Sequence, residues 1–104
     1  MTSGNNPREA TAAKAEFVRQ LRAAADSLKP LATTPVLTDP YALMWWALLG
    51  SMAELIEAQD GPINLKQRKF LRTGLFGGMG SLIDCNWHLT GDLWKAFQAL
   101  EPSS

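Results

Sequence analysis

The residues best suited to chemistry lie together in the C-terminal part of the chain, at Asp84, Cys85 and His88. Cys85 is the single cysteine and His88 the single histidine of the 104 residues. Side chains three or four positions apart on a helix lie on the same face, so both Asp84 and Cys85 can converge with His88. The chemistry that this cluster could support is metal binding or nucleophilic catalysis by a thiolate.

Neither chemistry is complete in this cluster. A zinc site needs a fuller set of ligands, and Asp92 could join it only if the helix continued through Gly91. A cysteine nucleophile needs a base that a third group orients, whereas neighbours on one helix seldom aim at one substrate atom. We therefore predict a small buried thiol beside an exposed Asp84 that pairs with His88, with no metal and no cofactor. A metal- or thiol-dependent enzyme at Cys85 and His88 remains an alternative hypothesis.

Four glycines precede this cluster. A phosphate-binding loop is disfavoured because such loops follow a β-strand and carry a lysine that is missing here. A glycine inside a helix costs about 0.8–1 kcal/mol relative to alanine, so close packing against another helix has to offset the loss. The helix-packing residues that we predict are Ala47, Gly50, Gly74, Gly77 and Gly78. The alternative is a simple break, with two shorter helices joined at Gly77-Gly78.

A basic stretch, "LKQRKFLR", leads into the glycines, and an acidic stretch ends the preceding helix. The bases are Lys66, Arg68, Lys69 and Arg72, and the acids are Glu54, Glu57 and Asp60. A tight turn at Gly61-Pro62 would lay the two helix ends side by side. We therefore expect the acids to face the bases, at about 0–1 kcal/mol per exposed pair. A partner that replaced these acids would bind at the basic edge.

Adjacent tryptophans form a second candidate surface. Trp45 and Trp46 project about 100° apart on a helix, so one core cannot easily accommodate both. We expect one to pack inside the bundle and the other to contact a partner or a second subunit, because large aromatic residues are enriched at binding hot spots. The predicted partner-binding residues are Trp45, Trp46, Lys66, Arg68, Lys69 and Arg72.

The elements that must position these residues are helices, and no strand pattern appears. We expect helices over residues 7–29, 40–58, 64–87 if the glycines allow, and 92–100, with a proline-rich extended linker over residues 30–39. The second of these helices carries no charge from Tyr41 to Ala53, so its surface should be surrounded. The predicted fold is all-α, a small bundle of about four helices with a hydrophobic central αα-hairpin made by the second and third.

The bulk composition limits the functional classes. We expect one helical domain over residues 6–101, with disordered tails at 1–5 and 102–104. Ten acidic and ten basic residues cancel, so no overall field attracts nucleic acid. A single cysteine forms no internal disulfide, and the N-terminus lacks the apolar stretch of a signal peptide, so a cytoplasmic location is expected.

The leading functional hypothesis is a small, non-enzymatic protein–protein interaction or regulatory module, which includes an inhibitor of a larger complex. We expect it to bind another protein, to form a homodimer and to take no small-molecule substrate. The alternative is a membrane-active protein, because two apolar segments, residues 41–53 and 73–83, joined by a basic link resemble the pattern of small phage holins. Both segments are shorter than the roughly 20 apolar residues that span a bilayer, and charges bound them.

Overall fold

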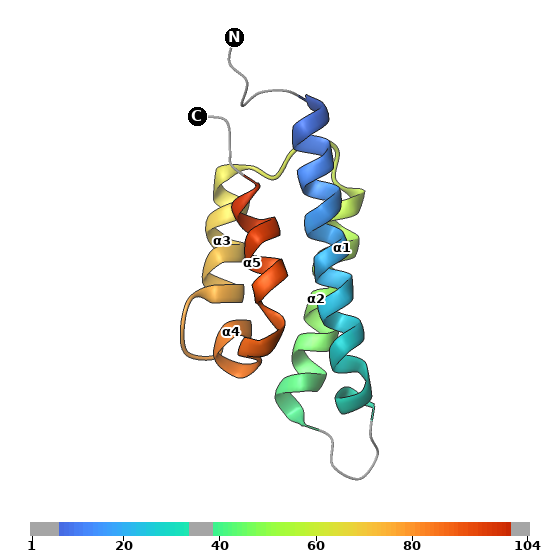
Figure 1. Ribbon diagram of the computed structural model, residues 1–104, viewed down its shortest axis with the longest axis vertical. Helices are drawn as coiled ribbons and strands as arrows, with labels where there is room; N and C mark the ends of the chain where they lie inside the picture. Colours follow the sequence, from blue (N-terminus) through green and yellow to red (C-terminus); the bar gives the residue numbers. More distant parts are fainter. Residues whose placement is uncertain (1–6, 34–38, 101–104) are drawn as a thin grey trace.

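The computed structural model describes residues 7–33 and 39–100, and the regular structure within these ranges is helical (Figure 1). The elements are α1 (Pro7–Ala32), α2 (Pro40–Ala58), α3 (Leu65–Phe76), α4 (Leu82–Cys85), the 3-10 helix η2 (Trp87–Leu89) and α5 (Gly91–Gln98). The predicted all-α bundle is confirmed. The predicted tails at residues 1–5 and 102–104 and the central part of the predicted linker, residues 34–38, lie outside the described residues.

α1 continues past its predicted end at Lys29, so that prediction was wrong. Proline disfavours a helical conformation in the residue before it, yet Pro30 lies inside the last turn of α1. Leu28 and Ala32, one turn apart, are both buried, and this packing outweighs the local preference. The end is closed at Thr33, whose backbone N–H donates to the Lys29 carbonyl at 3.0 Å.

α2 begins and ends at the predicted residues. The Asp39 carboxylate caps its N-terminus by accepting the Tyr41 N–H at 2.9 Å, and Pro40 occupies the first turn, where a backbone N–H is not needed. The buried residues of α2 recur at helical spacing and include Ala42, Trp45 and Leu49. α2 therefore has one well-defined core-facing side, although its sequence is apolar around the whole circumference.

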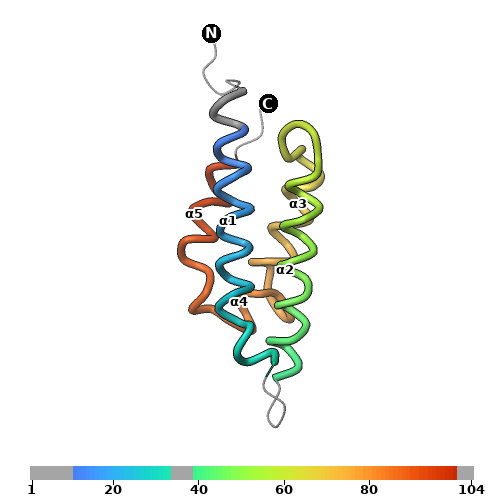
Figure 2. Tube along the Cα trace, turned by 90° about the vertical axis from the view of Figure 1, so that its right-hand side faces the viewer, coloured from blue at the N-terminus to red at the C-terminus, as the bar shows by residue number. Residues whose placement is uncertain are grey.

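The central hairpin of the bundle is α1 with α2, and not the predicted pair of second and third helices. α1 and α2 run antiparallel along their lengths, and α5 packs on α1 (Figure 1, Figure 2). α2 and α3 are not among the closely packed helix pairs. Buried alanines occur on both central helices, at Ala24 and Ala25 of α1 and at Ala42 and Ala53 of α2. These small side chains favour a close approach of α1 and α2.

The predicted packing strip on the glycines is also corrected. A Cβ built on Gly50 or Gly74 meets nothing within 4 Å apart from its own helix, so no neighbouring backbone approaches either residue. Ala47 is exposed. The strip fails because α2 uses its alanine-bearing side against α1 and leaves Gly50 at the margin of that contact.

The glycines instead end a helix, as in the alternative hypothesis of a break at Gly77-Gly78. α3 stops at Phe76, well before the predicted end near residue 87, and Gly77 is its C-terminal cap. A Cβ on Gly77 would lie 2.7 Å from the Thr73 Cα, and Gly78 has a φ of 128°, a conformation that suits glycine. A turn therefore replaces the expected long helix, and α4 restarts at Leu82 with Ser81 as its cap.

Candidate functional site

α2 exposes a stripe of large apolar side chains along one side of the helix, interrupted by Ser51 and opposite to part of its buried surface. Its members are Tyr41, Met44, Leu48 and Leu55, with side chains between 40% and 73% exposed. The expectation that α2 is surrounded is therefore not met by the described part of this chain, which covers only one side of the helix. An apolar stripe of this length without a cover marks a candidate binding surface.

Contacts on either side of α2 show which way the stripe faces. The Gln59 amide donates to the Gln67 amide oxygen of α3 at 3.1 Å, and Glu57 accepts from Arg22 of α1 at 2.8 Å. At about 100° per residue, Leu55 and Leu48 lie within about 40° of Gln59 around the helix. The stripe therefore lies on the α3 side of α2, away from α1.

α3 adds an exposed aromatic ring to this side. Phe70 is 70% exposed and follows Gln67 by three positions, which places it on the side of α3 that turns toward α2. We call the stripe together with Phe70 the α2–α3 apolar face: Tyr41, Met44, Leu48, Leu55 and Phe70. In Figure 2, α5 and α2 lie on opposite sides of α1, and the exposed fractions of the stripe residues show that they are not covered.

The two tryptophans that were predicted as partner-binding residues both contact the hydrophobic core. Trp45 is 4% exposed and belongs to the core cluster, so it is the tryptophan that was expected to pack inside the bundle, and its place among the partner-binding residues is corrected. Trp46 is half-buried and packs against the same cluster. Sequence reasoning missed Leu48 and Leu55, although the uncharged stretch that contains Leu48 was the signal for an exposed partner face.

A second surface lies between α3 and α5. Arg68, Arg72 and Phe76 follow one another at intervals of one helical turn along α3. The Phe76 ring lies 4.9 Å from the Trp94 ring and 5.3 Å from the Phe97 ring, measured between centroids. We call these residues the α3–α5 face: Arg68, Arg72, Phe76, Trp94 and Phe97.

Arg68 is held against the aromatic part of this face. Its guanidinium carbon lies 4.7 Å from the centroid of the Phe97 ring, a cation–π contact of about 0.5–2 kcal/mol. The Arg68 Nε is buried and has no hydrogen-bond partner among the described residues. The contact therefore orients a guanidinium whose hydrogen-bonding capacity is not used within the described part of the chain.

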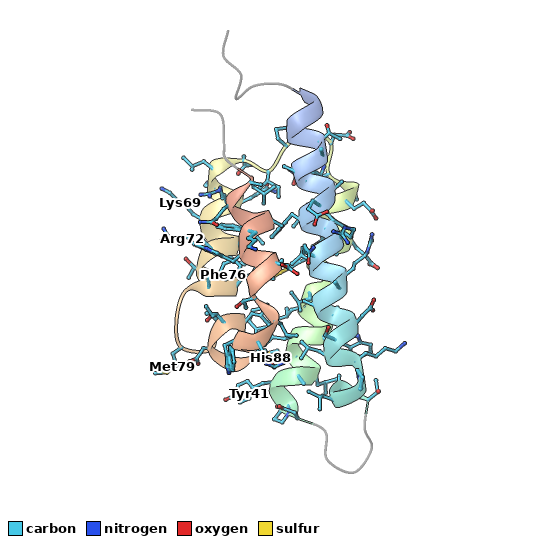
Figure 3. All side chains as sticks on the ribbon, in the orientation of Figure 1. Tyr41, Lys69, Arg72, Phe76, Met79 and His88 are labelled. Carbon is cyan, nitrogen blue, oxygen red and sulfur yellow. The ribbon has the colours of Figure 1, made fainter. Side chains whose placement is uncertain are left out.

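The expected pairing of acids with the basic edge is wrong. Within residues 7–33 and 39–100, the ion pairs are Arg22–Glu57 and Arg19–Glu16, and neither involves α3. Glu57 turns to Arg22 because α2 packs on α1 rather than on α3. Lys66, Lys69 and Arg72 are exposed, and Figure 3 shows Lys69 and Arg72 on the side of α3 away from α1.

The cluster at Asp84, Cys85 and His88 is split between two elements. α4 ends at Cys85, and His88 lies in η2, so the helical spacing that would align them is interrupted. Asp84 accepts the Gly80 N–H at 3.1 Å instead of pairing with His88, which corrects that expectation. Cys85 is half-buried. Among the residues that the structure describes, no group of three potential ligands is placed to hold a metal ion.

Comparison of the chain with family models, curated proteins and solved structures gives no match. None of the helices in the described ranges combines the length and the apolar character needed to cross a bilayer. Function is therefore inferred from the α2–α3 apolar face and the α3–α5 face.

The Arg22–Glu57 pair gives a pH-dependent prediction. Hydrogen bonding to Arg22, and then the charge of its guanidinium, lowers the pKa of Glu57 below 4.5. The pair therefore contributes to stability above the unfolded-state pKa, and this contribution is lost as the pH falls through the lowered folded-state pKa. In Arg22→Gln, we expect the pKa of Glu57 to rise toward 4.5, as followed by NMR titration of its carboxyl carbon. Glu16, which pairs with Arg19, should titrate unchanged, and an unshifted Glu57 would contradict the pairing.

Proposed function

We propose that this chain is a small, non-enzymatic protein–protein interaction module of regulatory type that forms a homodimer through the α2–α3 apolar face. The observation that carries the proposal is the uncovered stripe of Tyr41, Met44, Leu48 and Leu55. Removing such apolar area from water stabilises an association by about 25 cal/mol per Å² before the costs of binding are subtracted. A cytoplasmic location remains a prediction.

A second copy of the same chain is the occupant best matched to this face. The stripe contains no charged side chain, and the one charged residue within its span, Glu54, lies well off the line of Leu48 and Leu55 around the helix. An uncharged apolar stripe requires an equally apolar counterpart, which an identical stripe provides. A two-fold axis uses the same patch on both subunits, and the cores of homodimer interfaces are more apolar than other protein surfaces.

The test is the mass of the protein in solution, measured by light scattering on a sizing column over a range of concentrations. We expect the wild-type chain to have the mass of a dimer at high concentration and to dissociate on dilution. Leu48→Glu places a charge in the centre of the stripe and is expected to give a monomer at every concentration, because an unpaired charge is costly to bury.

Ala23→Glu is the matched control, since it adds the same charge to an exposed position of α1. This variant should keep the dimer mass, and both variants should keep the helical circular dichroism of the wild type. A wild-type monomer at all concentrations, or a Leu48→Glu protein that remains dimeric, would overturn the proposal.

A further inference from the structure

The α3–α5 face combines charge and apolar surface in a fixed arrangement. Arg68 is half-buried against Phe97, and Arg72 is exposed one turn further along α3. Trp94 is 36% exposed and is held by Phe76 at its edge and by Phe97 at a centroid distance of 5.8 Å. The two guanidinium groups therefore lie beside a cluster of aromatic rings that pack against one another.

The α3 part of this face carries positive charge that no described carboxylate pairs with. α3 contains four basic residues and no acidic one, as its sequence LKQRKFLRTGLF shows. Among the described residues, no carboxylate lies within ion-pair distance of Arg68 or Arg72, since the ion pairs join Arg19 to Glu16 and Arg22 to Glu57. The buried Arg68 Nε also lacks a hydrogen-bond partner among them. Because this Nε is shielded from solvent, the groups that an anionic ligand can reach are the exposed guanidinium of Arg72 and the outer part of the half-buried Arg68 guanidinium.

We infer that the α3–α5 face binds a carboxylate-bearing segment of a different protein, with acidic side chains on Arg68 and Arg72 and an adjacent apolar side chain on Trp94. The planar guanidinium matches a carboxylate with two parallel hydrogen bonds. The one-turn spacing of Arg68 and Arg72 on α3 suits acids that are themselves one turn apart on a helix. This surface is separate from the α2–α3 apolar face.

Charge and exposure favour an acidic protein segment over the other anionic partners. The chain has no net charge, whereas affinity for nucleic acid arises mostly from several phosphate contacts. Trp94, at 36% exposure, is the most exposed ring of the α3–α5 face, and it packs on Phe97. The face therefore offers one exposed aromatic surface, whereas single-stranded nucleic acid binds by stacking successive bases on several. Insertion into a membrane needs apolar side chains that project freely, and Trp94 is held in place by the rings around it.

The experiment measures fluorescence anisotropy of a labelled synthetic helical peptide with Glu one turn apart and Leu between them. A matched peptide has Gln in place of Glu. We expect the full-length protein to bind the Glu peptide at low salt, with affinity falling as salt rises, and to bind the Gln peptide at least about tenfold more weakly. Arg72→Gln and Trp94→Ala are each expected to weaken binding of the Glu peptide about tenfold.

Lys66→Gln is the matched control. Lys66 lies one turn before Phe70, on the side of α3 opposite to Arg68. The substitution removes one positive charge and should change the affinity by less than about threefold. Arg72→Gln is an exposed substitution, so its folding is checked simply by circular dichroism. Leu48→Glu should bind the peptide normally, which separates this inference from the proposed dimer.

Several outcomes overturn the inference. They are equal binding of the Glu and Gln peptides, no binding of the Glu peptide at low salt, and an effect of Lys66→Gln as large as that of Arg72→Gln. Tighter binding of labelled oligothymidylate or of phosphatidylserine vesicles than of the Glu peptide would assign the face to nucleic acid or to membrane instead.

Discussion

Phe97→Ala is expected to lower the free energy of unfolding by about 3–5 kcal/mol, the range for removing a buried aromatic ring. Phe97 is 1% exposed and lies where three helices meet. Its ring centroid is 6.1 Å from that of Phe17 in α1 and 5.3 Å from that of Phe76 in α3. The substitution also removes the ring beneath Arg68, at 4.7 Å. Because α5 is only eight residues long, packing rather than intrinsic helix propensity must stabilise it.

Urea denaturation followed by circular dichroism measures this loss. Trp94→Ala is the matched control, since Trp94 is on the same helix, contacts the same ring cluster and is 36% exposed. We expect Trp94→Ala to cost less than Phe97→Ala, because part of its surface is already in water. A loss below about 1 kcal/mol for Phe97→Ala would show that α5 is not anchored through this ring.

A pair of adjacent leucines in α2 gives the second large effect. Leu49 is fully buried and Leu48 is 40% exposed, although they are neighbours in an uncharged sequence. We expect Leu49→Ala to cost about 2–5 kcal/mol, because it removes buried methyl groups and leaves a cavity in the core. Leu48→Ala should cost less than about 1 kcal/mol in the monomer, because its side chain is partly hydrated there.

The measurement is chemical denaturation at a protein concentration low enough that the monomer predominates, so that dimer dissociation does not add to the cost of Leu48→Ala. The two variants remove the same atoms from the same helix and differ only in the side on which they lie. Equal costs, or a larger cost for Leu48→Ala, would mean that α2 is rotated relative to the structure and that the apolar face is misassigned.

Local signals predicted the start of α1, both ends of α2 and, within one residue, the starts of α3 and α5. Asp39 and Pro40 mark the start of α2, and the Asn64 side chain caps α3 in a capping box with Gln67. These features depend on residues close together in the chain, and the physical preference of each is strong enough to be visible without tertiary information. The error at Lys29 arose because a tertiary contact, the burial of Ala32, extended a helix beyond a local stop signal.

The candidate surfaces depended on information that the pattern of residues does not contain. A helix that is apolar on all sides has no periodicity from which to infer its buried side, so Trp45 and Leu48 could not be assigned to core and surface. Arg68 was predicted as part of a uniformly charged edge, whereas the structure separates it from Lys66 by its contact with Phe97. That contact joins residues far apart in the chain, and sequence spacing alone does not reveal it.

The amino-acid sequence by itself determined that this protein is helical and where α2 begins and ends. Only the tertiary structure decided that α2 pairs with α1, that Gly77 and Gly78 end a helix instead of lining a contact, and that Asp84 bonds to Gly80 and not to His88. Helix formation and capping depend on neighbours in the chain, whereas the choice between apolar partners depends on how side chains of particular sizes fit together in three dimensions.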